Sequence, residues 1–220
     1  MHQSPGFGPQ TFFFHGVRTR FYFRKTSASQ YDLIPGFTIF APMQERLILS
    51  SPLLEITISR LCQQLIENHQ EFEESVILGM QPRGVFFAER IHQQLREMAG
   101  KTLPIGYLDA TFYRDDFRRR ETPLKASENK VPFIIEGKKV ILIDDVLFTG
   151  RTIRAALDAM TAFGRPSRVE LMVLIDRKYS RDLPIEPNYV GMHVNTVQSQ
   201  RVLVEWTDQG AEKDRIWLIN

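Results

Sequence analysis

The feature that most constrains the fold is a run of four apolar residues, Val140 to Ile143, followed at once by Asp144 and Asp145. A run this short and this apolar predicts a strand that is buried on both faces. We expect the strand to end at the two carboxylates and a helix to begin after the sequence T-G-R-T at 149–152. Because ligands of open parallel sheets bind outside the carboxyl ends of the strands, residues 139–152 predict a binding site.

The residue types at this predicted strand end suit a phosphorylated sugar. A helix start offers free backbone N–H groups to an anion, and carboxylates accept hydrogen bonds from hydroxyls. A nucleotide site of the Walker type would also contain acids at a strand end, but it requires a G-x-x-x-x-G-K-[ST] loop, which the sequence lacks. A pair of solvated acids does not account for the T-G-R-T that follows. We therefore expect an anion cradle over Phe148 to Thr152 beside two acceptors for hydroxyls.

The rest of the chain alternates predicted strands and helices. Strands are expected at 76–80, 103–113, 139–145, 168–176, 189–194, 201–206 and 215–218, and helices with apolar faces at 51–65, 87–98 and 153–163. The first helix is expected to begin with Ser51 as N-cap and Pro52 at N1, and Gly100 closes the second. This order predicts an α/β fold, a mainly parallel twisted sheet with helices on both faces.

Polar groups follow three of the predicted strands, at 81–84, 144–152 and 176–177. The carboxyl ends of parallel strands meet at one edge, so we expect these groups to lie together. The polar stretch from Arg114 to Lys130 fits neither a helical nor a strand period, and Tyr113 to Arg120 is expected to leave the sheet as a mobile arm.

Composition limits the class of protein. The chain has 220 residues, one cysteine and no apolar run close to the length of a membrane-spanning helix, which favours a soluble, cytoplasmic protein. We expect Cys62 to be a small packed residue, and the five histidines (His2, His15, His69, His92 and His193) to have surface roles.

Residues 1–42 differ from the remainder. They hold four of the 28 basic residues and one of the 26 acids, which leaves 24 basic and 25 acidic residues for the nearly neutral body. The segment fits an organellar transit peptide, an extension that packs its aromatic residues on the body, or a disordered stretch upstream of the natural start. We favour an upstream start, with Met43 beginning a domain that spans 43–220.

The sequence I-L-I-D-D-V-L-F-T-G-R-T at 141–152 resembles the phosphoribosyl pyrophosphate (PRPP) motif of the type I phosphoribosyltransferases. Three further stretches agree, namely G-M-Q-P-R-G at 79–84, Y-R-D-D at 113–116, and 165–177 with 183–191. The narrower form D-D-V-L-F-T-G-R-T is similar to that of the PyrR subfamily, whose members are bifunctional pyrimidine operon regulators and uracil phosphoribosyltransferases. The resemblance covers about 44–220.

The resemblance implies a role for each part of the site. The PRPP site would comprise Asp144, Asp145, Val146, Leu147, Phe148, Thr149, Gly150, Arg151 and Thr152. Pyrophosphate would lie on Gln81, Pro82, Arg83 and Gly84, with a cis bond at Met80–Gln81 or Gln81–Pro82. Arg114, Asp115 and Asp145 would be catalytic, and Asp176 and Arg177 would lie on the base side, under a small hood that reaches about Gly191. Mg²⁺ would be bound mainly through the substrate, with Asp144 and Asp145 as the candidate protein ligands.

Three functions stay open. The first is transfer of ribose 5-phosphate from PRPP to uracil, giving UMP and pyrophosphate. The second is a UMP-responsive RNA-binding attenuator that recognises a pyrimidine-operon mRNA leader, which the nearly neutral body supports less well. The third is a phosphoribosyltransferase for hypoxanthine, guanine or orotate. The resemblance also implies a homodimer or a higher homo-oligomer.

Overall fold

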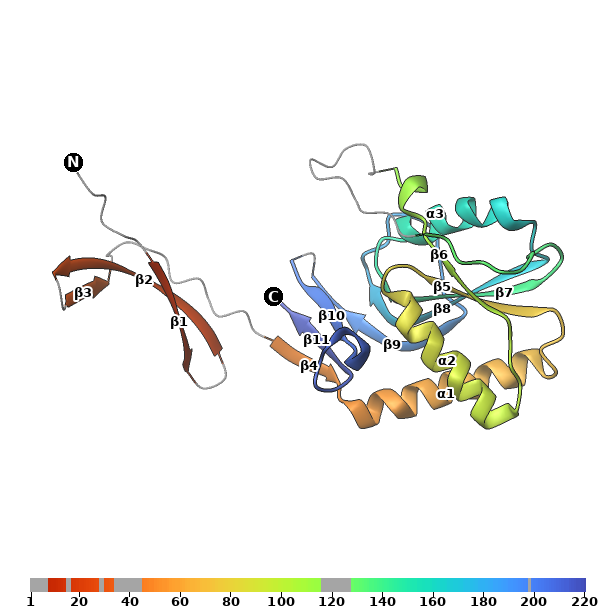
Figure 1. Ribbon diagram of the computed structural model, residues 1–220, viewed down its shortest axis with the longest axis horizontal. Coiled ribbons are helices and arrows are strands. Elements are labelled where there is room, and N and C mark those ends of the chain that lie inside the picture. The colour runs from red at the N-terminus through yellow and green to blue at the C-terminus, as the bar shows by residue number, and fades with distance from the viewer. Residues whose placement is uncertain (1–7, 15–16, 28–29, 34–44, 116–127, 198) are drawn as a thin grey trace.

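The computed structural model describes residues 8–14, 17–27, 30–33, 45–115, 128–197 and 199–220, with backbone alone before residue 45 (Figure 1). Its centre is one parallel sheet of five strands in the order β6-β5-β7-β8-β9. These strands are β5 (Ser75–Met80), β6 (Ile105–Leu108), β7 (Lys139–Leu147), β8 (Arg168–Lys178) and β9 (Tyr189–Asn195). The expected α/β fold is confirmed.

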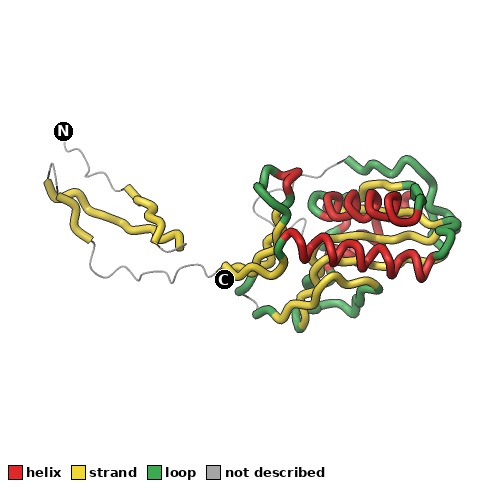
Figure 2. The backbone as a smooth tube through the Cα atoms, turned by 90° about the horizontal axis from the view of Figure 1, so that it is seen from below, coloured by secondary structure: helices red, strands yellow, loops and turns green. Residues whose placement is uncertain are grey.

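Helices cover both faces of this sheet (Figures 1 and 2). Helices α1 (Ser51–His69) and α2 (Gly84–Ala99) pack on the face that contains Ile141 and Ile143. Helix α3 (Arg151–Met160) packs on the opposite face, over Val140 and Leu142. Because successive residues of a strand point to opposite faces, the continuous apolar run of β7 supplies both cores at once.

A second sheet is antiparallel and joins the two ends of the domain. Its order is β10-β11-β4, where β4 is Glu45–Leu49, β10 is Arg201–Glu205 and β11 is Arg215–Ile219. The sequence does not predict β4, because its pairing partner β11 lies some 170 positions away along the chain. Three strands before residue 34 form a separate antiparallel sheet, namely β1 (Gly8–Phe14), β2 (Val17–Ser27) and β3 (Gln30–Leu33).

Several boundaries differ from the expected ones. Helix α1 begins at Ser51 with Ser50 as its N-cap, one residue earlier than predicted. Strand β6 is shorter than predicted, and a 3₁₀ turn at Thr111–Tyr113 follows it. Strand β7 continues to Leu147, so the two acids lie within the strand and not at its end. Met98 and Leu157 are exposed, because the buried stripe of each helix lies on neighbouring positions.

The expected surface role of His69 is wrong. Its ring is buried, with Nδ1 3.0 Å from the Ser75 hydroxyl and Nε2 2.8 Å from the Glu170 carboxylate. The end of α1 runs over the beginnings of β5 and β8, which encloses the ring. Cys62 is packed as expected, and burial raises the pKa of its thiol to about 12.

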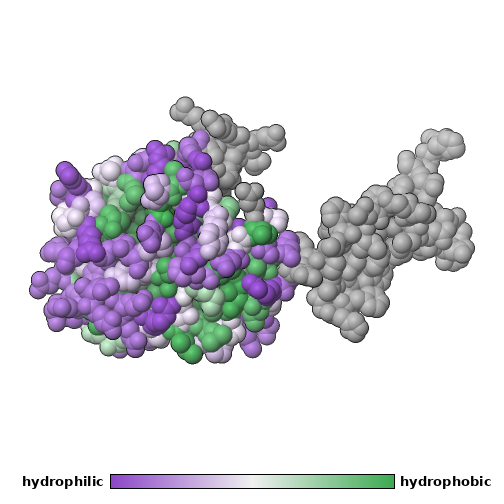
Figure 3. All heavy atoms as spheres, turned by 180° about the vertical axis from the view of Figure 1, so that it is seen from behind, coloured by the Kyte–Doolittle hydropathy of each residue, from purple (hydrophilic) through white to green (hydrophobic). Residues whose placement is uncertain are grey.

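The order of the strands locates a crevice. Strand β6 follows β5 along the chain and lies on one side of it, whereas β7 lies on the other side. The crossovers after β5 and β7 therefore depart in opposite directions, and in open α/β sheets this switch point is where ligands bind. Among the described residues, no helix is both long enough and apolar enough to span a bilayer. The face shown in Figure 3 is mostly hydrophilic, with hydrophobic residues gathered in a few patches.

Candidate functional site

The loop after β5 is in direct contact with strand β7 at the switch point. Helix α2 begins at Gly84, and a Cβ atom there would lie 2.8 Å from the Ile143 carbonyl oxygen and 3.0 Å from an Asp144 carboxylate oxygen. No side chain fits in this space, so glycine permits the close approach. The predicted pyrophosphate loop and the predicted acid pair are thus adjacent, as the sequence suggests.

The acid pair is partly enclosed and is contacted by one arginine. Asp145 is buried, and its carboxylate accepts a hydrogen bond from Arg83 Nε at 3.0 Å. Arg83 also donates from Nη2 to the Val204 carbonyl at 2.8 Å, which ties the start of α2 to β10. Asp144 accepts a hydrogen bond from the Asp145 backbone N–H at 2.9 Å. Among the described residues, Arg83 is the one cation in an ion pair with Asp144 or Asp145, so the two carboxylates share a single counter-charge.

The enclosure raises the pKa of both carboxyl groups. For Asp144 the largest cause is burial, and the second is repulsion from the neighbouring Asp145 carboxylate. Burial also raises the pKa of Asp145, although the Arg83 guanidinium opposes this effect. Burial and mutual repulsion disfavour the ionised forms of these two carboxyl groups. A cation, or hydrogen-bond donors such as ribose hydroxyls, would therefore be attracted to the pair.

The segment between β7 and α3 holds the residues of the predicted anion cradle. Helix α3 begins at Arg151, and its N-cap residue Gly150 has a φ of 88°, a left-handed conformation that glycine adopts without strain. The N-cap residue has no side chain, and the Arg151 N–H donates only a long hydrogen bond, of 3.5 Å, to the Thr149 hydroxyl. A helix start of this kind is a favourable place for an anion.

The predicted arm and the cradle meet at the start of α3. Arg114 Nη1 donates to the Thr152 hydroxyl at 2.6 Å. Arg151 forms ion pairs with Asp115 on the arm and with Asp182, whose carboxylate lies 3.0 Å from Arg151 Nε. The rest of the predicted arm, from Asp116 to Arg120, lies outside the described residues. The described part of the arm reaches the predicted cradle, because Arg114 contacts Thr152 and Asp115 contacts Arg151.

The loop at 81–84 contains one cis peptide bond, at Gln81–Pro82, which is one of the two expected alternatives. The Gln81 backbone N–H donates to the Leu108 carbonyl at 2.9 Å, and its side-chain amide donates to the Glu128 carbonyl at 2.7 Å. Gln81 therefore links the loop to the end of β6 and to Glu128, near the end of the polar stretch, and Arg83 is the loop's cationic side chain.

Asp176 and Arg177, the predicted base-side residues, are both buried at the end of β8, and among the described residues no ion pair joins them. Asp176 is bound by Arg181 and by His193, whose Nδ1 lies 3.0 Å from the carboxylate. Arg177 donates to the Thr196 hydroxyl at 3.0 Å and to the Gln200 carbonyl at 2.8 Å. These two side chains therefore point to different partners.

Sequence reasoning missed the residues that attach the segment after β8 to the cradle. Arg181 donates to the Phe148 carbonyl, and the backbone N–H groups of Asp182 and Leu183 donate to the Thr149 carbonyl at 3.0 and 3.2 Å. Ile185 packs against Gly150. The charged composition of 177–187 marks the segment as polar, but nothing local in it indicates which element it contacts.

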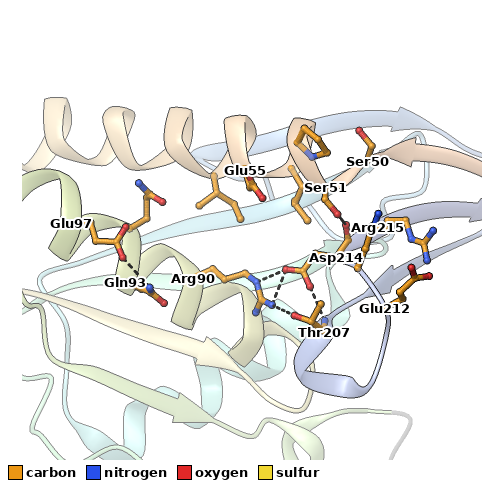
Figure 4. A pocket seen from close by; sticks show the side chains of 15 residues that line it. Ser50, Ser51, Glu55, Arg90, Gln93, Glu97, Thr207, Glu212, Asp214 and Arg215 are labelled. Carbon is orange, nitrogen blue, oxygen red and sulfur yellow. Dashed lines mark hydrogen bonds and ion pairs between the residues drawn. The ribbon is translucent and has the colours of Figure 1, made fainter.

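Two hollows border the described residues. One, of about 260 Å³, lies at the end of β8 and is lined by Asp176, Arg177, Lys178, Tyr179, Arg181, Ile185, Glu186 and Pro187. The other, of about 660 Å³, lies between the beginning of α1, the middle of α2 and the turn before β11 (Figure 4). There Arg90 is held by Asp208 and Asp214, so its charge is already neutralised. None of the predicted site residues lines the larger hollow.

The described residues contain no cluster of three or more side chains suited to hold a metal ion alone. The Asp144–Asp145 pair supplies oxygen donors and excess negative charge, which suits Mg²⁺ when substrate oxygens and water complete the coordination.

Comparison with known proteins agrees with the fold and the motifs. Residues 46–209 match the model of the phosphoribosyl transferase domain. A protein from Desulfosudis oleivorans named "Bifunctional protein PyrR" is 42% identical over 165 residues, which are 75% of this chain and 91% of the relative. Proteins of the same name from Geobacter sp. and Enterococcus faecalis are 43% and 38% identical, over 71% and 78% of this chain and 88% and 96% of theirs.

Solved structures extend the comparison to the fold. A hypoxanthine phosphoribosyltransferase from Staphylococcus aureus matches with a TM-score of 0.61 at 18% identity, covering 80% of this chain and 92% of the other. A hypoxanthine-guanine phosphoribosyltransferase from Bacillus anthracis matches with a TM-score of 0.61 at 15% identity, covering 81% and 99%. At this identity the likeness concerns the fold alone. The family model and the PyrR relatives together show that this chain belongs to the phosphoribosyltransferase family.

Proposed function

We propose that this protein transfers ribose 5-phosphate from PRPP to uracil, which yields UMP and pyrophosphate. The observation that carries the proposal is that the three predicted segments meet around β7 and its following helix: the loop at Gly84 lies against Asp144, and Arg114 of the arm bonds to Thr152 of the cradle. Relatives named bifunctional PyrR support pyrimidine chemistry over purine chemistry. The solved purine phosphoribosyltransferases are too distant in sequence to inform the choice of base, so they support the fold alone.

In this proposal Asp144 and Asp145 accept hydrogen bonds from the ribose 2′- and 3′-hydroxyls. The backbone and hydroxyl groups of Phe148 to Thr152 hold the 5′-phosphate at the start of α3, where the helix dipole favours negative charge. The raised pKa values of both acids support this role, because donors arriving from the ribose relieve the repulsion between the carboxylates.

The pyrophosphate end of PRPP is assigned to the loop at Gln81 to Gly84. The Arg83 side chain is 40% exposed and is therefore accessible to an anion although it contacts Asp145. Mg²⁺, when bound with PRPP, would neutralise part of the pyrophosphate charge, with Asp144 and Asp145 as its protein ligands. Arg114, now bonded to Thr152, is close enough to the cradle to cover the substrate from the arm.

The reaction breaks the bond between the anomeric carbon and a pyrophosphate oxygen and forms a bond from that carbon to N1 of uracil. The N1 proton is released to solvent. Positive charge develops on the ribose ring in the transition state and negative charge on the leaving group, so the protein needs positioning and electrostatic stabilisation and not a covalent nucleophile. The acid pair faces the first charge, and the Arg83 loop and the arm face the second.

A panel of bases tests the proposal. Purified protein is incubated with PRPP, Mg²⁺ and one of uracil, hypoxanthine, guanine or orotate, and the nucleotide product is identified by mass spectrometry. UMP is the expected product. The double variant Asp144→Asn with Asp145→Asn should remain folded by circular dichroism and lose UMP formation. Preferred formation of a purine nucleotide or of orotidylate would refute the choice of base.

A regulatory activity is the second candidate, because the relatives are named bifunctional. We propose UMP-responsive binding to a pyrimidine-operon mRNA leader. A filter-binding titration with leader RNA and with a scrambled RNA, each with and without UMP, tests it. Equal affinity for the two RNAs would leave the enzymatic function alone.

The remaining assignments complete the proposal. We assign the protein to the cytoplasm, since its one cysteine is free and buried, which suits a reducing compartment. We propose a homodimer or larger homo-oligomer, to be measured by light scattering after gel filtration. We retain the division into 1–42 and a catalytic domain at 43–220, and mass spectrometry of the native protein decides whether Met1 or Met43 begins it.

A further inference from the structure

Arg83 joins the loop after β5 to two other parts of the molecule at once. Its Nε donates to the Asp145 carboxylate at 3.0 Å, and its Nη2 donates to the Val204 carbonyl at 2.8 Å. The Asp145 side chain is 8% exposed, whereas the Arg83 side chain is 40% exposed. The guanidinium is therefore fixed by two acceptors of the protein while part of it still faces water.

The contact between Arg83 and Asp145 involves the two groups that the proposed function gives to opposite ends of PRPP. Asp145 is assigned to the ribose hydroxyls and to a divalent cation, and Arg83 is assigned to pyrophosphate. A carboxylate that is paired with arginine is a weaker ligand for a second cation, because the two cations repel each other. An arginine that is paired with a carboxylate likewise binds phosphate oxygens less well. The ion pair and the two ligand contacts thus compete.

Asp144 provides a comparison within the same site. It is the adjacent acid, and its carboxylate accepts a hydrogen bond from the Asp145 backbone N–H at 2.9 Å. Among the described residues it forms no ion pair, whereas Asp145 forms one with Arg83. The two acids carry the same formal charge and differ in this one contact. Substituting each in turn therefore separates the effect of the ion pair from that of general repulsion.

We propose that Arg83 is a positioning residue that exchanges partners, pairing with Asp145 until pyrophosphate draws it away and frees Asp145 for a divalent cation and the ribose. This inference rests on the proposed function. Arg83 forms no covalent bond and transfers no proton in the exchange. The exchange couples the two ends of PRPP, because an anion on Arg83 raises the affinity of Asp145 for a cation. A cation that arrives alone meets a carboxylate that is already paired.

The first test measures the binding of Mn²⁺ alone, as a paramagnetic substitute for Mg²⁺, by electron paramagnetic resonance at neutral pH. Arg83→Met removes the competing charge, so we expect it to tighten Mn²⁺ binding by about tenfold to thirtyfold. In an Asp145→Asn background the same change should alter the affinity by no more than about threefold. Arg83→Lys keeps the positive charge and should remain close to the wild-type affinity.

Arg96→Met is the matched control for the loss of one positive charge. Arg96 lies in the last turn of α2, the helix that begins directly after Arg83, and it is exposed and forms no ion pair within the described residues. The length of the helix between them places it about 20 Å from Arg83, beyond the screening length at physiological salt. This variant should leave the affinity for Mn²⁺ unchanged.

The second test keeps Arg83 and measures the binding of pyrophosphate by titration calorimetry, with EDTA present to remove divalent cations. Asp145→Asn releases the guanidinium, so we expect pyrophosphate to bind about tenfold more tightly. Asp144→Asn removes an equal charge from the adjacent position without breaking an ion pair, and it should tighten binding by no more than about threefold. Circular dichroism checks that each variant is folded.

Equal Mn²⁺ affinity in the wild type and Arg83→Met, or equal gains for pyrophosphate in the two aspartate variants, would overturn the inference. Neither measurement requires uracil or turnover. Failure of the wild-type protein to make UMP from uracil and PRPP would instead refute the proposed function, so the two failures are distinguishable.

Discussion

The Arg83–Asp145 ion pair predicts a stability change that depends on pH. Arg83 is the one cation within ion-pair distance of Asp145 among the described residues, and its charge opposes the burial that raises the pKa of Asp145. Replacing Arg83 by Met leaves Asp145 enclosed beside Asp144 without a counter-charge. We therefore expect the variant to be less stable wherever Asp145 is ionised.

The size of the effect follows from the exposure of the two side chains. Asp145 is 8% exposed and Arg83 40% exposed, so the pair lies between a buried and a surface ion pair. Breaking a buried pair costs about 3–5 kcal/mol, and a surface pair contributes about 0–1 kcal/mol. We expect Arg83→Met to lower the free energy of unfolding by about 2 kcal/mol at pH 7.5. In an Asp145→Asn background the same change should cost about 0.5 kcal/mol.

The sign of the pH dependence is fixed by the direction of the pKa shift. Because the pKa of Asp145 is raised in the folded state, the folded protein holds this proton more tightly than the unfolded chain does. Ionisation of Asp145 therefore reduces stability as the pH rises through this range. Arg83→Met raises the pKa further, so its cost should be greatest at pH 7.5 and should diminish as the pH falls and the Asp145 carboxyl of the folded proteins takes up its proton.

Urea denaturation of the four proteins in this cycle at pH 7.5 and at pH 4 measures the effect. The hydrogen bond from Arg83 to the Val204 carbonyl is lost in both backgrounds, so it cancels in the cycle. An equal cost in both backgrounds, or a cost that does not change with pH, would refute the electrostatic account.

Three further predictions concern the same site. Asp144→Asn should raise the free energy of unfolding of the ligand-free protein by about 1 kcal/mol at pH 7.5, because burial and Asp145 oppose its charge, while UMP formation falls at least about a hundredfold; a variant that is both less stable and active contradicts this. Gly84→Ala should cost about 1–3 kcal/mol by thermal or urea unfolding, since its Cβ would lie 2.8 Å from the Ile143 carbonyl oxygen, and an unchanged midpoint would show that the loop yields freely. Thr152→Val removes the acceptor of the Arg114 hydrogen bond and should raise KM for PRPP about tenfold in steady-state assays, with the same KM for uracil; an unchanged KM for PRPP would remove Thr152 from the cradle.

The sequence by itself determined the parallel sheet and the edge of it that holds the candidate site. Apolar runs such as Val140 to Ile143 are local patterns. A strand buried on both faces removes all of their side chains from water, and few other short elements do so. The polar residues that follow β5 and β7 meet because parallel strands end at one edge. The anion cradle likewise depends on a helix start, which Gly150 and the residues after it specify locally.

Only the tertiary structure decided which charges are neutralised. Arg83 reaches Asp145 and the Val204 carbonyl, which lie 62 and 121 positions further along the chain. Asp176 forms ion pairs with Arg181 and His193. The adjacent Arg177 donates to the Thr196 hydroxyl and has no carboxylate partner among the described residues. Adjacent residues of a strand face opposite sides of the sheet, so neighbours in sequence meet different partners. These partners come from distant elements, and no local pattern records them.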